Sequence, residues 1–280
     1  MMMTKEQLAP KSMKLAILDM YNGTPNLGMK SIKAIVEMFP EFEYKVYDVR
    51  GNCELPGLDY DVYICSGGPG SPLEREGLWI RAFSILMDKL WNFNNMYDEK
   101  KHVFFICHSF QMICNHFGLG DIVPRKSRAF GIFPVHKTED GKKEILFKGL
   151  DDPFYAADFR DWQFIQPNQS RVTAMGAEVL AIEKKRDHVP LERAIMAVRF
   201  SKFWFGVQFH PEATSDGMLR HLQVPERKED VITHHGVEKY DEIIKLAGEK
   251  EKLDTTRKLI LPRFLEEAIR YQTAFSLHLS

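Results

Sequence analysis

The first half of the chain alternates strand-like apolar runs with segments of helical periodicity. Four short segments predict strands: residues 13–19, 44–49, 59–68 and 102–107. Residues 26–39 and 78–91 instead place apolar side chains three and four positions apart, which predicts amphipathic helices. Strands that alternate with helices in units of this size indicate right-handed crossovers and a parallel sheet.

The pattern changes after Phe117. Four further strand-like segments follow with short connections: 130–138, 178–185, 194–200 and 203–209. Only Ser201 and Lys202 separate the last two segments, so we expect a β-hairpin there. The fold class that this order predicts is α/β, a three-layer α/β/α arrangement around a central sheet that is mixed but mostly parallel.

From Ala213 onward the sequence is charged and helical. Residues 237–248 and 256–275 predict helices, with Pro262 either beginning a new helix or kinking one. The run ERKED at 226–230 predicts a linker. The last predicted helix carries an apolar stripe that comprises Leu261, Phe264, Leu265, Ala268 and Ile269. We expect this stripe to dock on the protein's own domain, and the alternative is a homodimer through these helices.

These patterns divide the chain into three parts. We predict an N-terminal leader at 1–12, one domain at 13–215 and a helical C-terminal extension at 216–280. Hydrophobic residues make up 44% of the 280 residues, which is enough for a full core.

Charge and cysteine usage exclude several classes of function. The formal net charge of −1 gives no electrostatic basis for binding nucleic acid or an anionic membrane surface. No run of about 18 apolar residues is present. Four cysteines without a CxxC pair do not suggest a disulfide framework or a zinc site. We therefore expect a cytoplasmic protein that holds no metal and no cofactor.

One cysteine stands where a predicted strand turns into a predicted helix. Residues 104–111 (FFICHSFQ) place Cys107 at the end of an apolar run and at the start of a helical pattern, which is the layout of a nucleophile elbow. Unpaired N–H groups at the helix N-terminus would favour a thiolate there. The alternative is a buried structural thiol, the commoner fate of a free cysteine, and this segment alone does not decide between them.

Two other segments bring polar groups to the ends of strands. Residues 65–72 (CSGGPGSP) form a rigid turn whose N–H groups can point at a ligand, although an ordinary surface turn has a similar composition. Residues 206–212 (GVQFHPE) deliver His210, the kind of base that a cysteine nucleophile needs. Glu212 lies on the same face of the extended chain and could hold the second ring nitrogen.

The three segments together resemble the class I (triad) glutamine amidotransferase family. The matching stretches are SGGPGSP at 66–72, CHSFQ at 107–111 and VQFHPE at 207–212, and the resemblance covers roughly residues 13–215. It implies hydrolysis of the glutamine side-chain amide through a γ-glutamyl thioester, with release of ammonia for an acceptor.

The resemblance also implies roles for individual residues. Cys107 would be the nucleophile, His210 the base and then the acid, and Glu212 the residue that orients the histidine. Further positions follow from the same match: backbone N–H donors to the oxyanion at Gly68 and His108, and substrate contacts at Gln111 and Gly70.

The sequence departs from the family pattern at the elbow. Phe105 and Ser109 stand where the family has glycines, and YAADFRDWQF at 155–164 shows no clear counterpart of the family's substrate-contacting segment. No synthetase domain accompanies the matched region, so we expect ammonia to pass to a separate synthetase or acceptor subunit. Two alternatives stay open: a γ-glutamyl hydrolase that uses the same triad, and a degenerate amidotransferase that serves as a binding or regulatory subunit.

Overall fold

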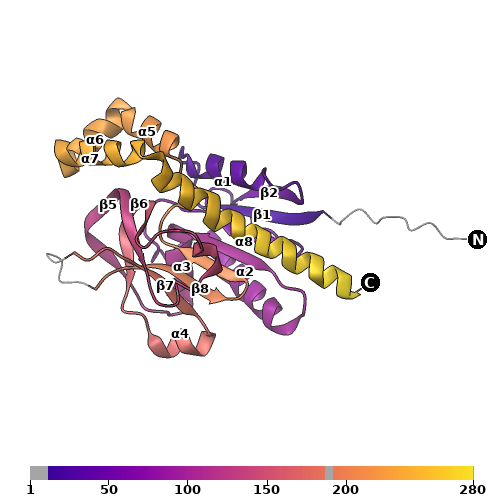
Figure 1. The fold of residues 1–280 in the computed structure, drawn as a ribbon. Helices are drawn as coiled ribbons and strands as arrows, with labels where there is room; N and C mark the ends of the chain where they lie inside the picture. The colour runs from indigo at the N-terminus through magenta and orange to yellow at the C-terminus, as the bar shows by residue number, and fades with distance from the viewer. Residues whose placement is uncertain (1–11, 187–191, 280) are drawn as a thin grey trace, which may run out of the picture.

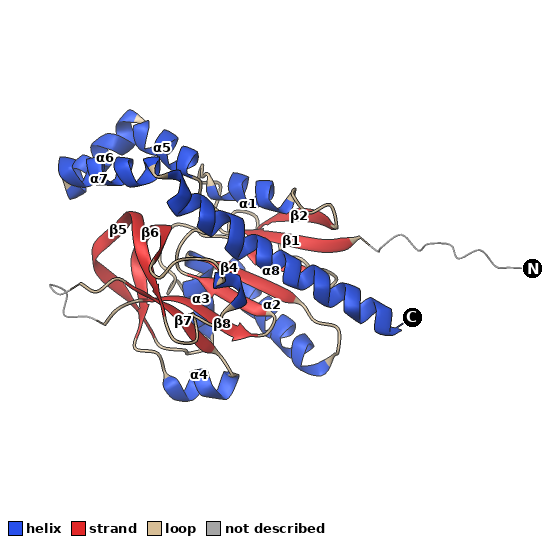
Figure 2. Ribbon diagram, in the orientation of Figure 1, coloured by secondary structure: helices blue, strands red, loops and turns tan. Residues whose placement is uncertain are grey.

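A single nine-stranded sheet with helices on both faces forms the centre of the molecule (Figures 1 and 2). The computed structural model describes residues 12–186 and 192–279. Five strands run parallel to one another, in the spatial order β2 (Phe42–Asp48), β1 (Met13–Asp19), β3 (Val62–Cys65), β4 (His102–Ile106) and β9 (Trp204–Val207). Antiparallel pairing then adds β8 (Ile195–Ser201), β7 (Glu178–Glu183), β5 (Asp121–Lys137) and β6 (Phe154–Ile165). The predicted α/β fold with a mixed sheet is confirmed, and the β8–β9 pair confirms the predicted hairpin.

Each face of the sheet has its own hydrophobic core. Helices α1 (Gly28–Val36) and α8 (Lys250–Leu279) cover one face, and α2 (Leu78–Met96) and α3 (His108–His116) cover the other (Figure 1). Along β1, Leu15 and Ile17 enter the first core, whereas Ala16 and Leu18 enter the second. Because both faces are buried, the strand is a continuous apolar run, as central parallel strands usually are.

Strands β5 and β6 form a long hairpin whose second strand passes next to the end of β9. A backbone bridge joins Ala157 of β6 to His210, just beyond β9. The sequence did not predict β6, because its charged residues interrupt the apolar pattern. Two of those charges are paired inside the protein: Arg160 Nε lies 3.0 and 2.9 Å from the two carboxylate oxygens of Asp158, and both side chains are at most 3% exposed.

The C-terminal extension consists of helices α5 (Ser215–Gln223), α6 (Pro225–His235), α7 (Val237–Gly248) and α8. The helix predicted at 237–248 is confirmed, but the linker predicted at 226–230 is wrong because these residues lie within α6. Pro225 occupies the first turn of α6, where its missing N–H costs nothing, and Glu226 suits the positive helix N-terminus. Pro262 lies inside α8 and does not begin a new helix.

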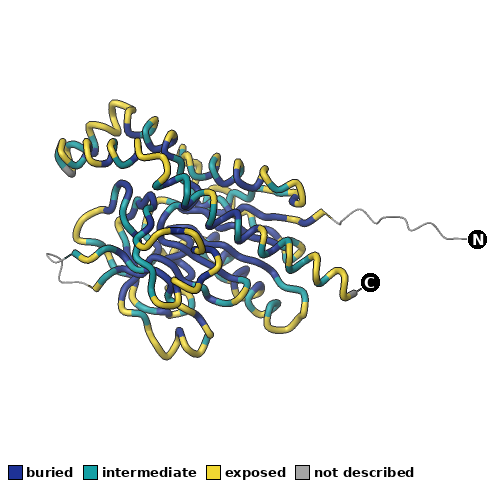
Figure 3. Tube along the Cα trace, viewed as in Figure 1, coloured by how far each residue is buried: buried dark blue, intermediate teal, exposed yellow. Residues whose placement is uncertain are grey.

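The predicted apolar stripe of α8 docks on the protein's own sheet. Four of its residues are at most 1% exposed and belong to the core that α1 also covers: Leu261, Phe264, Leu265 and Ala268. Ile269 is partly buried against the same core. Figure 3 shows buried segments of α8 facing the sheet, and the Phe264 ring meets the Phe104 ring edge-on at 5.1 Å. Internal docking is confirmed, and it leaves no exposed stripe for a second copy to cover.

Helices α5, α6 and α7 form a smaller cluster over the β5–β6 hairpin. Ile243 of α7 packs against Gly131 of β5, where an added Cβ would lie 3.0 Å from the isoleucine side chain. Met218 of α5 and Val231 of α6 are buried in the same cluster. The division of the chain at residue 215 remains a prediction, and the predicted leader lies outside the described residues apart from Ser12. Across the described helices, none is long and apolar enough to cross a membrane.

The remaining short elements connect the strands of the second half. Helix α4 (Gln169–Met175) follows β6, and a single 3-10 turn, η1 (Ile145–Phe147), lies between β5 and β6. Leu146 and Phe147 of η1 are buried in the core under α8. These connections therefore lie away from the carboxyl ends of β3, β4 and β9, where the three candidate segments meet.

Candidate active site

Cys107 occupies a strained turn between strand β4 and helix α3. Its backbone has φ 50° and ψ −98°, a region that residues other than glycine rarely adopt and that costs roughly 1–3 kcal/mol. Backbone hydrogen bonds hold the turn on both sides: the Cys107 N–H donates to Val207 O at 2.8 Å, and the Gln111 N–H donates to Cys107 O at 3.0 Å. The structure thus has the geometry of the predicted elbow.

Ser109, which replaces one of the family's glycines, ties the elbow to the neighbouring strand. Its hydroxyl accepts a hydrogen bond from the Ile106 N–H at 3.0 Å and donates to Cys65 O at 2.8 Å. The side chain is fully buried. A serine therefore fits this crowded position because its hydroxyl both accepts and donates a hydrogen bond.

Phe105, which replaces the other glycine, is accommodated by a glycine on the next strand. Gly206 of β9 lies directly opposite Phe105 in the parallel ladder. A Cβ added to Gly206 would lie 2.7 Å from the Phe110 ring, 3.0 Å from Phe200 and 3.3 Å from Phe105 Cβ. The space that the family obtains with small residues at the elbow is thus provided here by the adjacent strand.

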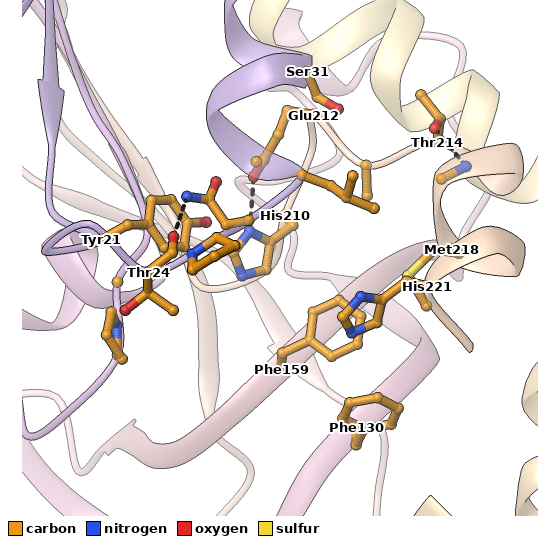
Figure 4. A pocket seen from close by; sticks show the side chains of 18 of the residues that line it. Tyr21, Thr24, Ser31, Phe130, Phe159, His210, Glu212, Thr214, Met218 and His221 are labelled. Carbon is orange, nitrogen blue, oxygen red and sulfur yellow. Dashed lines mark hydrogen bonds and ion pairs between the residues drawn. The ribbon is translucent and has the colours of Figure 1, made fainter. Parts of the chain in front are cut away.

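His210 and Glu212 form a hydrogen-bonded pair at the end of β9 (Figure 4). His210 Nδ1 lies 2.8 Å from Glu212 Oε1, and the carboxylate side chain is 1% exposed. The His210 N–H donates to Ala157 O at 2.8 Å, which fixes the backbone that carries the ring. Burial by itself lowers the pKa of His210, but the negative charges of Glu212 and Cys107 outweigh it and raise that pKa well above its ordinary value.

Cys107 and His210 both lie beside Gly67. A Cβ added to Gly67 would lie 2.8 Å from His210 Cε1 and 3.7 Å from Cys107 Cβ. The imidazole and the cysteine side chain are therefore no farther apart than these two distances combined. The structure brings the predicted nucleophile and the predicted base together although 103 positions separate them in the sequence.

The glycine-rich loop after β3 borders the same space. Gly68 must be a glycine, because an added Cβ would lie 2.5 Å from Met20 O. Gly70 has φ +89°, which also favours glycine. Arg50, which sequence reasoning missed, holds this loop: its guanidinium donates to Pro69 O and lies 3.4 Å from Met20 O. The sequence did contain a signal for Arg50: it directly follows a predicted parallel strand, which places it at the carboxyl edge of the sheet.

His108 and Gln111 are both buried in helix α3. Burial, aided by the positive charge of Arg50, lowers the pKa of His108 to about 3, so its side chain is neutral and only its backbone N–H is a candidate oxyanion donor. Gln111 Nε2 donates to Trp162 O at 2.9 Å and to Gln208 Oε1 at 2.8 Å. Its amide group thus joins β6 to the end of β9, and a substrate contact at Gln111 stays a prediction.

Gln208 and Tyr21 are two further neighbours of the pair that the sequence did not reveal. Gln208 Nε2 points at Cys107 Sγ at 3.6 Å. The Tyr21 hydroxyl lies beside Gly28 and Gly67. A Cβ added to Gly28 would be 2.5 Å from the hydroxyl oxygen, and a Cβ added to Gly67 would be 3.1 Å from it. Burial, followed by the negative charges near it, raises the pKa of Tyr21 well above its ordinary value, so the phenol is neutral beside the pair.

A cavity of about 270 Å³ opens beside His210. Tyr21 and Gly68 line it on the side of the sheet, and Phe159 of β6 packs against the His210 ring at 5.8 Å (Figure 4). Its far wall is formed by α5, with Met218 and His221 directed into it (Figure 4). A cysteine at an elbow, with a paired histidine and a glycine loop that line a neighbouring cavity, can carry out acyl transfer.

The fold and these segments define a class of protein. A family model described as Glutamine amidotransferase class-I matches residues 25–222, and the chain belongs to that family. Anthranilate synthase component 2 from Methanothermobacter marburgensis is 23% identical over 208 residues, which cover 66% of this chain and 92% of that protein.

Solved structures share the fold at lower identity. A glutamine amidotransferase from Thermotoga maritima superposes with a TM-score of 0.67 at 17% identity, over 92% of this chain and 98% of that chain. A putative GMP synthase subunit from Thermoplasma acidophilum has a TM-score of 0.50 at 19% identity, over 72% and 85% of the two chains. At these identities the likeness concerns the fold alone.

Proposed function

We propose that the protein hydrolyses the side-chain amide of glutamine through a thioester on Cys107. The observation that supports this most strongly is geometric: Cys107 stands in a strained elbow beside Gly67, next to the His210–Glu212 pair, whose carboxylate is buried. Family membership supports the same chemistry. A degenerate binding subunit would not need to retain a strained cysteine beside a paired histidine.

In the proposed reaction, His210 holds the proton that Cys107 has given up, and the Cys107 thiolate attacks the amide carbon. The oxyanion that forms accepts hydrogen bonds from the Gly68 and His108 N–H groups. The carbon–nitrogen bond then breaks, and His210 donates its proton to the departing ammonia. Water hydrolyses the thioester and returns the thiol. Glu212 keeps the imidazole oriented and stabilises its protonated form throughout.

The ammonia acceptor is proposed to be a separate protein chain. One relative is named as component 2 of anthranilate synthase, and another is named as part of a GMP synthase, so both names denote pieces of multi-component enzymes. We extend this arrangement to the present protein and place both proteins in the cytoplasm. Purification of the tagged chain from its native cell, followed by identification of stoichiometric partners, tests the proposal.

The hydrolytic activity itself has a direct test. Purified protein is incubated with glutamine, and glutamate and ammonia are measured together, with Cys107→Ala as the control. Equal release of both products by the wild type and none by the variant is expected. If glutamate does not form even when the co-purified partner is present, the chain is not a glutaminase.

A further inference from the structure

The cavity lies on the histidine side of the reaction centre. His210, Glu212 and Thr214 line it, whereas Cys107 and Gln111 do not. In the proposed function, His210 protonates the departing nitrogen, so the leaving group must lie against His210. This cavity is therefore where the part of the substrate beyond the scissile amide bond would lie.

The cavity is much larger than ammonia requires. Its volume of about 270 Å³ is about nine times the space of roughly 30 Å³ that a water-sized molecule occupies in the liquid. Helix α5 of the C-terminal extension closes its far side with Met218 and His221, and Phe130 and Phe159 of the hairpin provide aromatic walls (Figure 4). A space of this size and lining suits a leaving amine with an apolar side chain.

The charges around the cavity favour an anion. Arg128 and Arg227 both line it, and among the described lining residues Glu212, already paired with His210, is the one carboxylate. Arg128 has a weak partner in Asp161 at 3.6 Å, with the two side chains 52% and 65% exposed. No carboxylate in the described part of the chain pairs with Arg227. Burial and the neighbouring charge of Arg227 lower the pKa of His221, which keeps that ring neutral.

We propose that this cavity is a subsite for the amine half of a γ-glutamyl amino acid or peptide, with Arg227 binding its free carboxylate. The inference rests on the proposed thioester chemistry and adds γ-glutamyl amino acids and peptides to glutamine as substrates. Arginine suits this role because its fork of N–H donors matches a carboxylate. The covalent step is balanced: the Cys107 sulfur–carbon bond forms, the carbon–nitrogen bond breaks, the amine leaves with the proton from His210, and one water consumes the thioester.

Binding to the inactive protein tests the subsite apart from catalysis. Cys107→Ala protein is titrated calorimetrically with glutamine, with γ-glutamylphenylalanine and with γ-glutamylphenethylamine, which lacks the second carboxylate. The dipeptide should bind at least about tenfold more tightly than either of the others, the size of one charge-assisted contact. Adding Arg227→Ala should remove that advantage and leave glutamine binding unchanged. Arg220→Ala, in α5 at a position that does not line the cavity, is the matched control.

Each outcome decides the matter. A dipeptide advantage that Arg227→Ala removes and Arg220→Ala leaves intact supports the subsite. Equal binding of glutamine and the dipeptide overturns the proposed subsite. Equal weakening of both by Arg227→Ala also overturns it, because Arg227 would then contact the glutamyl half of the substrate. An advantage that survives Arg227→Ala also overturns the role of Arg227. If the wild type hydrolyses neither compound while the inactive variant still shows the advantage, the proposed function fails and the subsite stands.

Discussion

Replacing Gly206 by alanine should disturb the elbow from the neighbouring strand. The added Cβ would lie 2.7 Å from the Phe110 ring and 3.0 Å from Phe200, both inside normal contact distance and both fully buried. Phe105 Cβ, at 3.3 Å, blocks the third direction. Because three aromatic residues must shift at once, we expect a loss of about 1–3 kcal/mol in the free energy of unfolding.

Equilibrium unfolding in urea measures this loss, and Gly248→Ala is the matched control. Gly248 is the last residue of α7 and has nothing within 4 Å of an added Cβ, so the same chemical change there should be neutral or slightly stabilising. Alkylation of Cys107 by a glutamine-like electrophile should also slow in Gly206→Ala, because β9 carries both the elbow's hydrogen bond and His210.

Coupling to Phe110 tests the steric reasoning itself. In the double variant with Phe110→Ala, the ring that sits closest to the new Cβ is gone, so the two losses should sum to more than the measured total by about 1 kcal/mol or more. If Gly206→Ala unfolds with the same midpoint as Gly248→Ala, or if the two losses are simply additive, Gly206 is not the residue that makes room for Phe105.

Three further perturbations address the pair and the extension. Cys107→Ala should abolish hydrolysis, whereas Glu212→Gln should reduce turnover by about 10⁴-fold or less, because its proposed role is to orient; equal losses in a coupled assay would demand another role for Glu212. Because the negative charges of Glu212 and Cys107 raise the pKa of His210, nuclear magnetic resonance should show that pKa falling in both variants; a rise in either variant would contradict the assigned geometry. Phe264→Ala should lower the free energy of unfolding by about 3–5 kcal/mol at any protein concentration. Leu277→Ala, at an exposed position of the same helix, should have a small effect. A loss in Phe264→Ala that disappears on dilution would point to contacts between chains.

The parts of the fold that could be predicted are those whose buried residues recur at regular strand or helix spacing along the chain. Strand β1 is apolar on both faces and was evident, and so was the stripe of α8. Strand β6 was missed because it buries charged side chains, which interrupt the apolar pattern: Arg160 pairs with Asp158 of the same strand and lies 3.6 Å from Glu183 of β7. Helix α6 was missed because it has almost no apolar pattern to detect. Most of its side chains are exposed, and among its described residues Val231 alone is more than nine-tenths buried.

The meeting of Cys107 with His210 could be predicted because the carboxyl ends of adjacent parallel strands lie at one edge of a sheet. The residues that hold this pair could not, because each depends on a neighbour across strands. Arg50 acts on the loop after β3, and Gln208 acts on Cys107 from the end of β9. Neither contact follows from spacing along the chain.

The departure at Phe105 shows what an elbow motif requires physically. The tight strand-to-helix turn needs free volume beside the nucleophile, and a glycine two residues before the cysteine is one way to provide it. Here the volume comes from Gly206, which is opposite Phe105 in the parallel ladder and 101 positions away in sequence. The bulky ring then packs against Phe200 and Trp204, with ring centroids 5.8 and 5.5 Å away. A motif read only along the chain would count Phe105 as evidence of a degenerate site, whereas the pairing of β4 with β9 shows how the ring is accommodated beside the elbow.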